Sequence, residues 1–385
     1  MDNASIEAAI AGARLTVDLG AIADNWRLLN DMSGNAECSA VVKANAYGLG
    51  IEQVVPTLWK TGCRTFFVAL PEEGIRTRKI APDAVIYILA GFFPEALETY
   101  RRYKLRPVVN AEIDVWLKAV GDEKLPYAIQ LETGMNRLGL PIPDYHGLLA
   151  SDALDGYPPS LLMSHLACAD TPADALSGIQ NRAFKPAVEA RTGTVASLAN
   201  SAGIFLGSDY HYDLVRPGIA LYGGACTADA LLKNPMKPTI KIESRILQIK
   251  SAAPGETVGY GGAETVLPST HDMSGRRILA TIASGYADGY IRSAGSSDIR
   301  KGAFAAWRGH QVPLLGRVSM DLTTVDLTDH PDVDELAGCD YQNEWIELIG
   351  PNVVLDDTAT IAGTIGYEFL TSLGNRFHRI YTNDI

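Results

Sequence analysis

Eight short apolar runs, separated by stretches long enough to form helices, are the feature that most constrains the fold of this chain. The runs end at Lys43, Ala69, Leu89, Asn110, Glu132, His165, Leu198 and Arg216. Segments of helical character such as GIEQVVPTLWKTG and PADALSGIQNRAFKPAVEART lie between them. Strands that alternate with helices indicate a parallel sheet. Eight such units predict an α/β fold, a closed (β/α)8 barrel of the TIM type, over residues 20–235.

The sequence pattern changes after about residue 236. Ile240, Ile242 and Ile246 share one parity, whereas Leu247 and Ile249 share the other, as expected for a strand with a bulge. Further strand candidates are separated by clusters of Gly, Pro, Asn and Asp. This pattern predicts a mainly antiparallel β domain over residues 236–385. The early run ARLTVDL also has a strand pattern, and we assign it, at about residues 12–19, to the same domain.

Composition and charge exclude several classes of protein. A chain of 385 residues with 47% hydrophobic and 20% charged residues is globular and long enough for two domains. The net charge of −12, without a Lys/Arg-rich run, argues against a nucleic-acid partner. The N-terminus lacks an export signal and no run of about eighteen apolar residues occurs, so we expect a cytoplasmic protein without a membrane span.

Cysteine and histidine spacing gives no support for a metal site or a disulfide framework. The five cysteines are scattered and never form a C-x-x-C pair, which indicates reduced, structural thiols. The seven histidines show no close ligand spacing. We therefore expect no bound metal.

Polar residues follow several of the predicted barrel strands. Lys43 ends the first strand, His165 ends the sixth, and NSAG (200–203) and RPG (216–218) follow the last two. The active site of such a barrel lies at the carboxyl ends of its strands. The loops after strands 7 and 8 commonly bind phosphate through backbone amides, a role that suits Ser201, Gly203 and Gly218.

Lys43 is the candidate nucleophile, although two interpretations are open. Near Arg137 and Arg216 and partly desolvated, its pKa would be lowered, and its free amine could condense with an aldehyde. Alternatively, the lysine reaches solvent or pairs with a carboxylate, which VVK alone favours. Ordinary roles also exist for Arg216, as a surface salt-bridge residue, and for Tyr260, as a turn tyrosine among glycines.

Nine motifs, in order along the chain, resemble those of the alanine racemase family of pyridoxal 5′-phosphate (PLP) enzymes. They are AVVKANAYGLG, ETGMNRLG, MSHLACAD, LANSAG, LVRPGIALYG, VGYGG, GYADGY, GRVSMD and IGYE. The resemblance extends from about residue 14 to the C-terminus. It implies PLP as cofactor, alanine as substrate, and a barrel followed by a β domain. It also implies a homodimer with shared active sites, in which the β domain of one subunit covers the barrel mouth of the other.

The same resemblance implies roles for individual residues. Lys43 is the Schiff-base lysine and one of two acid/base groups, and Tyr260 is the second, because racemisation needs one proton-transfer group on each face of Cα. His165 and Arg216 support Tyr260, and Arg216 also faces the pyridine nitrogen, where its permanent charge keeps the ring a weak electron sink. The resemblance assigns the cofactor phosphate to Tyr47, Asn200, Ser201, Gly218, Ile219 and Tyr367. It assigns the substrate to Arg137, Met320, Asp321 and Tyr286.

Two positions depart from the commonest family pattern. Gln130 stands where many relatives have a lysine that can be carbamylated to support the nearby arginine. Ser197 stands where some have a histidine, which leaves part of the support of Arg216 unassigned. The resemblance predicts an alanine racemase for cell-wall precursors or alanine catabolism. A racemase of broader specificity, a decarboxylase of the same architecture and a non-catalytic PLP-binding protein are the alternatives, and Tyr367 favours alanine because a smaller residue would open the pocket.

Overall fold

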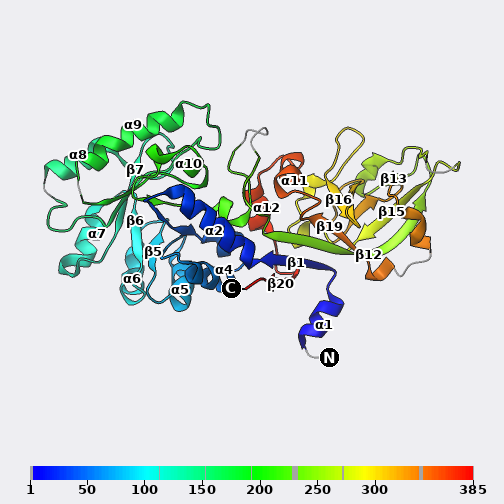
Figure 1. The fold of residues 1–385 in the computed structure, drawn as a ribbon, viewed down its shortest axis with the longest axis horizontal. Coiled ribbons are helices and arrows are strands. Elements are labelled where there is room, and N and C mark those ends of the chain that lie inside the picture. Colours follow the sequence, from blue (N-terminus) through cyan, green and yellow to red (C-terminus); the bar gives the residue numbers. More distant parts are fainter. Residues whose placement is uncertain are drawn as a thin grey trace. The chain divides into compact units, whose positions relative to one another are not determined.

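The computed structural model describes residues 3–111, 113–151, 153–191, 193–227, 233–270, 273–337 and 341–384. The chain divides into two compact units (Figure 1). The barrel unit consists mainly of Leu19–Lys237, and the β unit consists of Pro238–Asn383 together with the N-terminal segment up to Asp18. Each unit has its own sheet and its own core, so each is described separately.

The barrel unit is built on a parallel sheet. Its strand order is β10-β9-β7-β6-β5-β4-β3. The bounds are Ala40–Val41 for β3, Thr65–Val68 for β4, Val85–Ile88 for β5, Arg106–Val109 for β6, Ala128–Glu132 for β7, Leu161–Met163 for β9 and Val195–Ser197 for β10. The short strand β8 (Leu140–Pro141) lies beside β7.

The ends of this sheet are joined through one further strand. β11 (Leu214–Val215) pairs in parallel with β2 (Glu37–Cys38), which leads into β3. On the other side, a parallel bridge between Asn200 and Arg216 links the chain after β10 to the chain after β11. Every one of the eight apolar runs thus contains a strand, and the predicted (β/α)8 barrel is confirmed.

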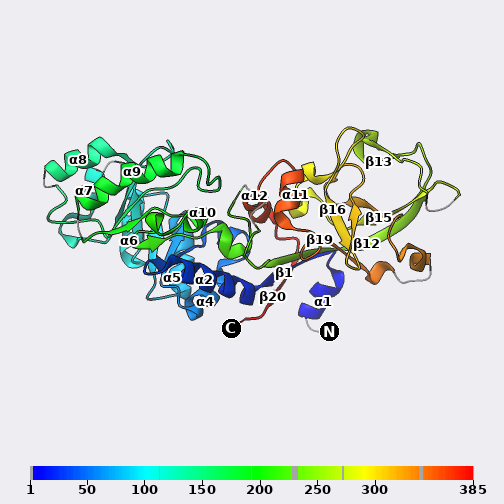
Figure 2. The same cartoon turned by 45° about the horizontal axis from the view of Figure 1, so that its top comes forward.

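Helices connect the barrel strands and lie around them (Figures 1 and 2). They are α2 (Leu19–Ser33), α4 (Ile51–Thr61), α5 (Pro71–Ile80), α6 (Leu97–Arg102), α7 (Ile113–Val120), α8 (Ile142–Ala150), α9 (Leu176–Glu189) and α10 (Ser201–Phe205). Strands covered on both faces need continuous apolar runs, and Phe66, Phe67, Ile86 and Ile129 are accordingly inaccessible to solvent.

The β unit contains a mainly antiparallel sheet, as predicted. Its order is β17-β16-β19-β12-β1-β20, with β15 on β12 and β18 on β15. The bounds are Ala13–Asp18 for β1, Ile240–Ala252 for β12, Arg277–Ile282 for β15, Phe304–Trp307 for β16, His310–Pro313 for β17, Thr323–Asp326 for β18, Trp345–Ile349 for β19 and His378–Thr382 for β20. The predicted strand at ARLTVDL is β1, which pairs with β12.

Two local features of the β unit test the strand pattern further. The pairing of β12 with β15 shifts between Ile246 and Gln248, where the parity of the apolar residues changes. Between β19 and β20 the chain forms two helices, α11 (Leu355–Ile361) and α12 (Gly366–Ser372), which the strand-based prediction did not contain. Leu355, Thr358 and Ala359 are buried in α11, and Gly366, Phe369 and Leu370 are buried in α12, a spacing of three to four residues that suits helices and not strands.

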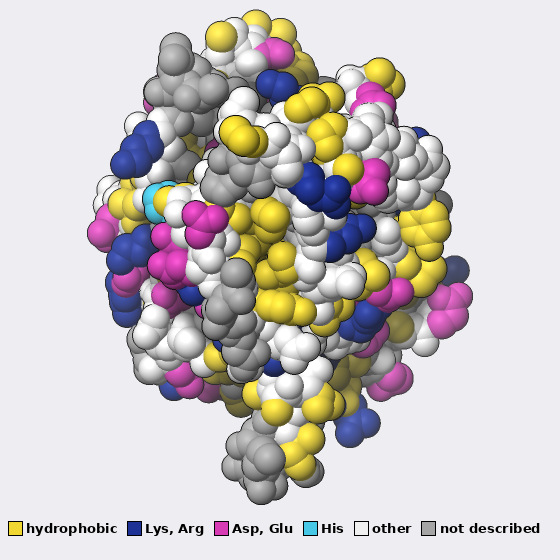
Figure 3. All heavy atoms as spheres, turned by 90° about the vertical axis from the view of Figure 1, so that its right-hand side faces the viewer, with side chains coloured by type: hydrophobic (Ala, Val, Ile, Leu, Met, Phe, Trp, Pro, Cys, Tyr) yellow, Lys and Arg dark blue, Asp and Glu magenta, His cyan; other side chains and the backbone are white. Residues whose placement is uncertain are grey.

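The surface and the polar side chains give three further observations. On the face seen in Figure 3, basic, acidic and apolar side chains are interspersed. In the described ranges, no helix is long and apolar enough to cross a membrane, and no three His, Cys, Asp or Glu side chains gather as metal ligands would. Cys38, Cys63, Cys168 and Cys226 are free thiols, whereas Cys339 lies outside the described residues.

Candidate functional site

A single left-handed turn follows the first barrel strand. Lys43 begins this turn, α3 (Lys43–Tyr47), in which four residues without a glycine among them, 44 to 47, have φ between 52° and 56°. The amide of Gly48 donates to the carbonyl oxygen of Ala44 at 2.7 Å. Left-handed helix costs L-residues roughly 1–2 kcal/mol per residue. The turn must therefore be stabilised by the surrounding structure.

Side chains of α4 and α5 supply that stabilisation. The Glu73 carboxylate accepts a hydrogen bond from the amide of Asn45 at 3.2 Å. The side-chain oxygen of Asn45 accepts from Arg76 at 2.6 Å and from the amide of Ile51 at 3.2 Å. Arg76 is in turn held by Glu52 at 2.7 Å. The turn that begins at Lys43 is thus fixed by polar groups from the next βα unit.

The amine of Lys43 has the environment of a nucleophile. It forms no ion pair or hydrogen bond with any residue that the structure describes. Burial lowers the pKa of Lys43, and the positive charge of Arg137 lowers it further, whereas Glu73 acts in the opposite direction. A lysine paired with a carboxylate, the ordinary alternative, is not what the structure contains. A larger fraction of this amine is therefore neutral than in a solvent-exposed lysine.

Arg216 is a buried cation that has no carboxylate partner among the described residues. Its side chain is held by the hydroxyl of Ser197, by the carbonyl oxygen of Ser164 and by that of Leu198 at 3.3 Å. The residue is 3% exposed, and it forms no ion pair with any described residue, so it is not a surface salt-bridge arginine. Burial lowers the pKa of Arg216 to about 9, so the guanidinium stays charged at neutral pH.

Ser197 provides the support for Arg216 that the sequence left unassigned. Its hydroxyl accepts a hydrogen bond from Arg216 and donates to the carbonyl oxygen of Leu214 at 2.5 Å. On the other side, Nδ1 of His165 lies 3.5 Å from Arg216. Burial, with the charges of Arg216 and Arg137, lowers the pKa of His165 to about 3. The imidazole is therefore neutral at physiological pH and can accept a hydrogen bond.

Backbone donors gather where the last two barrel strands end. The hydroxyl of Ser201 accepts from the amide of Gly218 at 2.7 Å and from that of Ala220 at 3.3 Å, so the two loops are adjacent. Ser201 and Ala202 open α10, and Ile219 opens the short 3-10 helix η4 (Ile219–Tyr222). The first amides of a helix have no acceptor within that helix. The Ser201 amide faces the carbonyl of Arg216 in the bridge between the two loops, so the amides of Ala202 and Ile219 are the candidate donors for an anion such as a phosphate.

Close packing around Gly218 and Asn200 shapes this group of donors. A Cβ at Gly218 would come within 2.3 Å of the hydroxyl oxygen of Tyr47, so only glycine allows the tyrosine to approach the backbone there. Asn200 caps α10 by accepting from the amide of Gly203 at 2.9 Å. The fold thus brings together Tyr47, Asn200, Ser201, Gly218 and Ile219, five of the residues that the resemblance assigns to a phosphate site; that role stays a prediction.

Arg137 lies on an exposed loop after β7, and Gln130 holds that loop. The side-chain amide of Gln130, which is buried, donates to the carbonyl oxygen of Leu138 at 2.9 Å. The Glu132 carboxylate accepts from the amide of Met135 at 2.7 Å. Gln130 therefore supports the loop that carries Arg137 directly, through a neutral hydrogen bond.

The remaining predicted site residues belong to the β unit, where their side chains are exposed. Tyr260 is 71% and Met320 53% exposed, and Tyr286 and Tyr367 are also exposed. Tyr260 begins the 3-10 helix η5 (Tyr260–Gly262), and Tyr286 begins η6 (Tyr286–Asp288). Tyr367 lies on α12.

Backbone hydrogen bonds hold the loop of Tyr286 against that of Met320. The amide of Tyr286 donates to the carbonyl oxygen of Ser319 at 3.0 Å, and the amide of Ala287 donates to that of Met320 at 2.9 Å. Asp321 follows Met320 and pairs with Arg376 at 2.7 Å. The structure therefore brings Tyr286, Met320 and Asp321 together within the β unit.

Sequence reasoning missed the residues that hold these groups. Glu73 and Arg76 fix the turn after Lys43, and Arg376 contacts the loops of Tyr286 and Asp321. The PEEG segment after the second barrel strand was a usable signal for Glu73, because an acidic residue in a first helical turn often bonds nearby amides. No comparable signal existed for Arg376.

Fold and site together define a class of enzyme. It is a (β/α)8-barrel enzyme in which, within the described residues, the amine after the first strand and a buried arginine have no carboxylate partner, and backbone amides lie after the last two strands. Comparison with known proteins agrees with this class. Residues 17–226 match the family model of the N-terminal domain of alanine racemase, and residues 239–381 match that of its C-terminal domain.

Individual relatives match nearly the full length of the chain. The alanine racemase of Rhizobium meliloti is 45% identical over 382 residues, 96% of this chain and 97% of that protein. The biosynthetic alanine racemase of Agrobacterium fabrum is 46% identical over 382 residues, 96% of this chain and 94% of that protein. The crystal structure of Bartonella henselae alanine racemase with covalently bound pyridoxal phosphate has a TM-score of 0.86, 37% identity, and coverage of 97% and 100%. The chain belongs to the alanine racemase family, which confirms the predicted resemblance, and it is an enzyme of the racemase class.

Proposed function

We propose that this enzyme interconverts L- and D-alanine with PLP as its cofactor, using Lys43 and Tyr260 as the two acid/base groups. The observation that carries the proposal is the unpaired amine of Lys43, whose pKa burial and Arg137 lower, in the same barrel as the buried Arg216. The names of the relatives support alanine as substrate, and the covalently bound pyridoxal phosphate of the Bartonella henselae enzyme supports the cofactor.

The donor set of the barrel unit fits PLP. The amides of Ala202 and Ile219 and the hydroxyls of Ser201 and Tyr47 suit a phosphate, and Asn200 shapes the same loop. Tyr367, from the β unit, would complete the phosphate set. Lys43 would hold the cofactor covalently, and Arg216 would face its ring nitrogen. The bound cofactor would supply an electron sink that makes the Cα proton of an attached amino acid acidic.

The two bases would act on opposite faces of Cα. Lys43 can accept a proton because its lowered pKa favours the neutral amine. Tyr260 would give or take a proton on the other face, and a phenol with an ordinary pKa near 10 needs hydrogen-bonding support for that role. We assign that support to His165 and Arg216. Because Arg216 keeps its proton, it would donate a hydrogen bond to the ring nitrogen without protonating it, and the uncharged ring, a weaker electron sink, would favour return of the proton to Cα over transamination.

The substrate would be held by residues of both units. The guanidinium of Arg137 has no carboxylate partner among the described residues and could pair with the substrate carboxylate. Met320 and Asp321 would lie on the substrate side, and the bulk of Tyr286 would restrict the length of the amino-acid side chain.

We extend the proposal to the assembly and the cellular role. Tyr260, Tyr286 and Met320 expose large side chains on one unit, as expected of residues that a partner covers. A homodimer with shared active sites would place them over the barrel of the partner subunit. In the cytoplasm, such an enzyme would supply D-alanine for peptidoglycan or serve alanine catabolism.

Chiral chromatography of L-alanine incubated with the purified enzyme and PLP tests the proposal. We expect D-alanine to accumulate towards a ratio of about one to one, because enantiomers have equal free energies. Absence of D-alanine would refute it. Parallel incubations with serine and lysine separate a broader-specificity racemase, and release of carbon dioxide would reveal a decarboxylase. A cofactor band without turnover would indicate a non-catalytic PLP-binding protein.

A further inference from the structure

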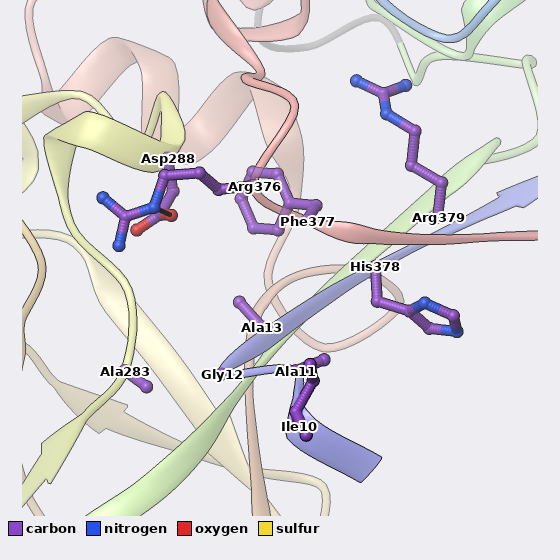
Figure 4. A pocket seen from close by; sticks show the side chains of 10 residues that line it. All are labelled: Ile10, Ala11, Gly12, Ala13, Ala283, Asp288, Arg376, Phe377, His378 and Arg379. Atoms are coloured by element: carbon purple, nitrogen blue, oxygen red, sulfur yellow. Dashed lines mark ion pairs between the residues drawn. The ribbon is translucent and has the colours of Figure 1, made fainter. Parts of the chain in front are cut away.

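Arg376, in the segment after α12, joins two loops of the β unit. Its Nε lies 3.1 Å from a carboxylate oxygen of Asp288, and its Nη1 lies 2.7 Å from one of Asp321 (Figure 4 shows the pair with Asp288). Asp288 ends η6, the helix that Tyr286 begins. Asp321 belongs to the tight turn in which the amide of Ser319 donates to the carbonyl oxygen of Leu322 at 2.9 Å. One guanidinium thus bridges the loops of Tyr286 and Met320.

The Asp288 end of this bridge is firmly anchored. Asp288 is 3% exposed, and its second carboxylate oxygen accepts from the amide of Gly285 at 2.8 Å. Its backbone carbonyl oxygen accepts from the amide of Gly374 at 2.8 Å. A Cβ at Gly289 would come within 2.1 Å of the carbonyl oxygen of Ser372, so the chain is closely packed there. Asp288 therefore offers Arg376 a fixed point.

The Asp321 end depends on Arg376. The side chain of Asp321 is 53% exposed, and Arg376 is its carboxylate's only partner among the described residues. A groove of about 610 Å³, lined by residues 10–13, Ala283, Asp288 and 376–379, lies beside the arginine (Figure 4). No other described side chain therefore ties the Asp321 carboxylate to η6.

We propose that Arg376 is a positioning residue that fixes Met320 and Asp321 relative to Tyr286, and thereby sets the affinity for the amino-acid substrate and the limit on its side-chain length. The inference rests on the proposed function, which places these three residues at the substrate. A guanidinium suits the task because its Nε and Nη1 can bond two carboxylates at once, whereas a lysine offers one point charge.

Hydrogen exchange tests the bridge without relying on activity. In Arg376→Ala we expect the amides of Ser319, Tyr286 and Ala287, which close and join the two loops, to exchange about tenfold faster than in the wild type. Arg308→Ala is the matched control, because it also removes an arginine that bridges carboxylates, those of Asp332, Glu335 and Glu344, but contacts neither loop. Unchanged exchange in a folded Arg376→Ala overturns the proposal, whether or not the enzyme racemises alanine.

Steady-state kinetics tests the consequence for the substrate. We expect Arg376→Ala to raise KM for L-alanine about tenfold with kcat within about threefold, and to raise the serine-to-alanine ratio of kcat/KM about threefold. Arg376→Lys should raise KM about threefold. If Arg376→Ala does not fold, the KM of Arg376→Lys tests the positioning role in its place. Asp288→Asn, combined with Arg376→Ala, should add little to the single change, because both remove the same pair.

The outcomes separate this inference from the proposed function. KM within twofold of the wild type in folded Arg376→Ala, or in folded Arg376→Lys, overturns the positioning role. Equal loss of kcat in Arg376→Ala and Arg308→Ala also overturns it, because it would indicate general destabilisation. A wild-type enzyme that does not racemise alanine refutes the proposed function instead, and the exchange experiment then still decides whether the bridge holds the loops.

Discussion

The two units present their site residues in opposite ways. In the barrel unit, Tyr47, Ser201 and Arg216 are buried, and Ser201 and Arg216 bond to backbone groups of their own unit. In the β unit, Tyr260 and Met320 are exposed on short turns. The barrel set is preorganised for a ligand of its own, which is the expected property of a cofactor cradle. The β-unit set has the property expected of groups that act on something bound elsewhere. Five experiments test this difference between the barrel unit and the β unit.

Lys43→Ala should have the largest effect, because under the proposed function it removes both a base and the attachment point of the cofactor. We expect racemisation to fall below about 10⁻³ of the wild-type rate, and the visible absorbance of the lysine-bound cofactor to disappear. Absorption spectra before and after borohydride reduction provide the measurement. An unchanged, reducible band would show that another lysine holds the cofactor.

Tyr260→Phe should separate catalysis from cofactor binding, because it removes one hydroxyl from the β unit. We expect a rate loss of about 10²–10³-fold, typical of a missing acid/base group, with cofactor content close to that of the wild type. The exchange of the Cα proton with deuterium from each enantiomer should become unequal. Loss of the cofactor from a folded variant would instead make Tyr260 a cofactor-binding residue. The β unit would then share the cofactor-binding role that we assign to the barrel unit.

Mixing two inactive variants tests whether the two sets work across subunits. Lys43→Ala and Tyr260→Ala chains, denatured and refolded together, should regain about a quarter of the wild-type activity, because half of the random dimers carry one intact site. Each variant refolded alone is the control. No recovery despite confirmed heterodimers would mean that both bases come from one chain.

The neutral His165 should make the barrel unit sensitive to acid. Its pKa is lowered to about 3 in the fold, so below about pH 6.5 the unfolded chain takes up a proton that the folded chain does not. Stability is therefore lost as the pH falls from about 6.5 towards 3. His165→Asn should flatten the fall of Tm with pH by a few degrees, and His146→Asn, which changes an exposed histidine of α8, is the control. An identical slope in both variants would contradict this account.

Removal of dissolved carbon dioxide should have no effect on activity, because Gln130 stands where many relatives have a lysine that can be carbamylated. Because its neutral amide bonds Leu138 directly, we expect activity to be unchanged when dissolved carbon dioxide and bicarbonate are removed. Steady-state rates in degassed buffer, with and without added bicarbonate, provide the measurement. A rate that falls on removal and recovers on addition would mean that a lysine elsewhere is carbamylated.

The strands were predictable from the sequence because their signals are local. Buried parallel strands require apolar runs, and the bulge in β12 appears directly as a change of parity after Ile246. The barrel end of the site followed from topology, since parallel strands place their carboxyl ends together. The helices α11 and α12 were missed because the preceding strands set a misleading expectation for residues 355–372.

The missed parts of the site depend on residues far apart in sequence. Nothing in the segment ANAY indicates a left-handed turn, because that conformation is imposed by Glu73 and Arg76 from the next βα unit. The role of Ser197 required the position of Arg216, and the role of Arg376 required two loops at once. Such groups follow from a folded structure and not from periodicity.

The turn after Lys43 also limits how this site could be transplanted in protein engineering. A graft of residues 43–47 alone onto another barrel would relax to a right-handed or extended conformation, because the cost of four left-handed residues would no longer be offset. The smallest portable piece is the first two βα units, from β2 to the end of α5, which carries Asn45 together with Glu73 and Arg76. For design, Lys43 and helix α5 of the following βα unit must therefore be transferred together.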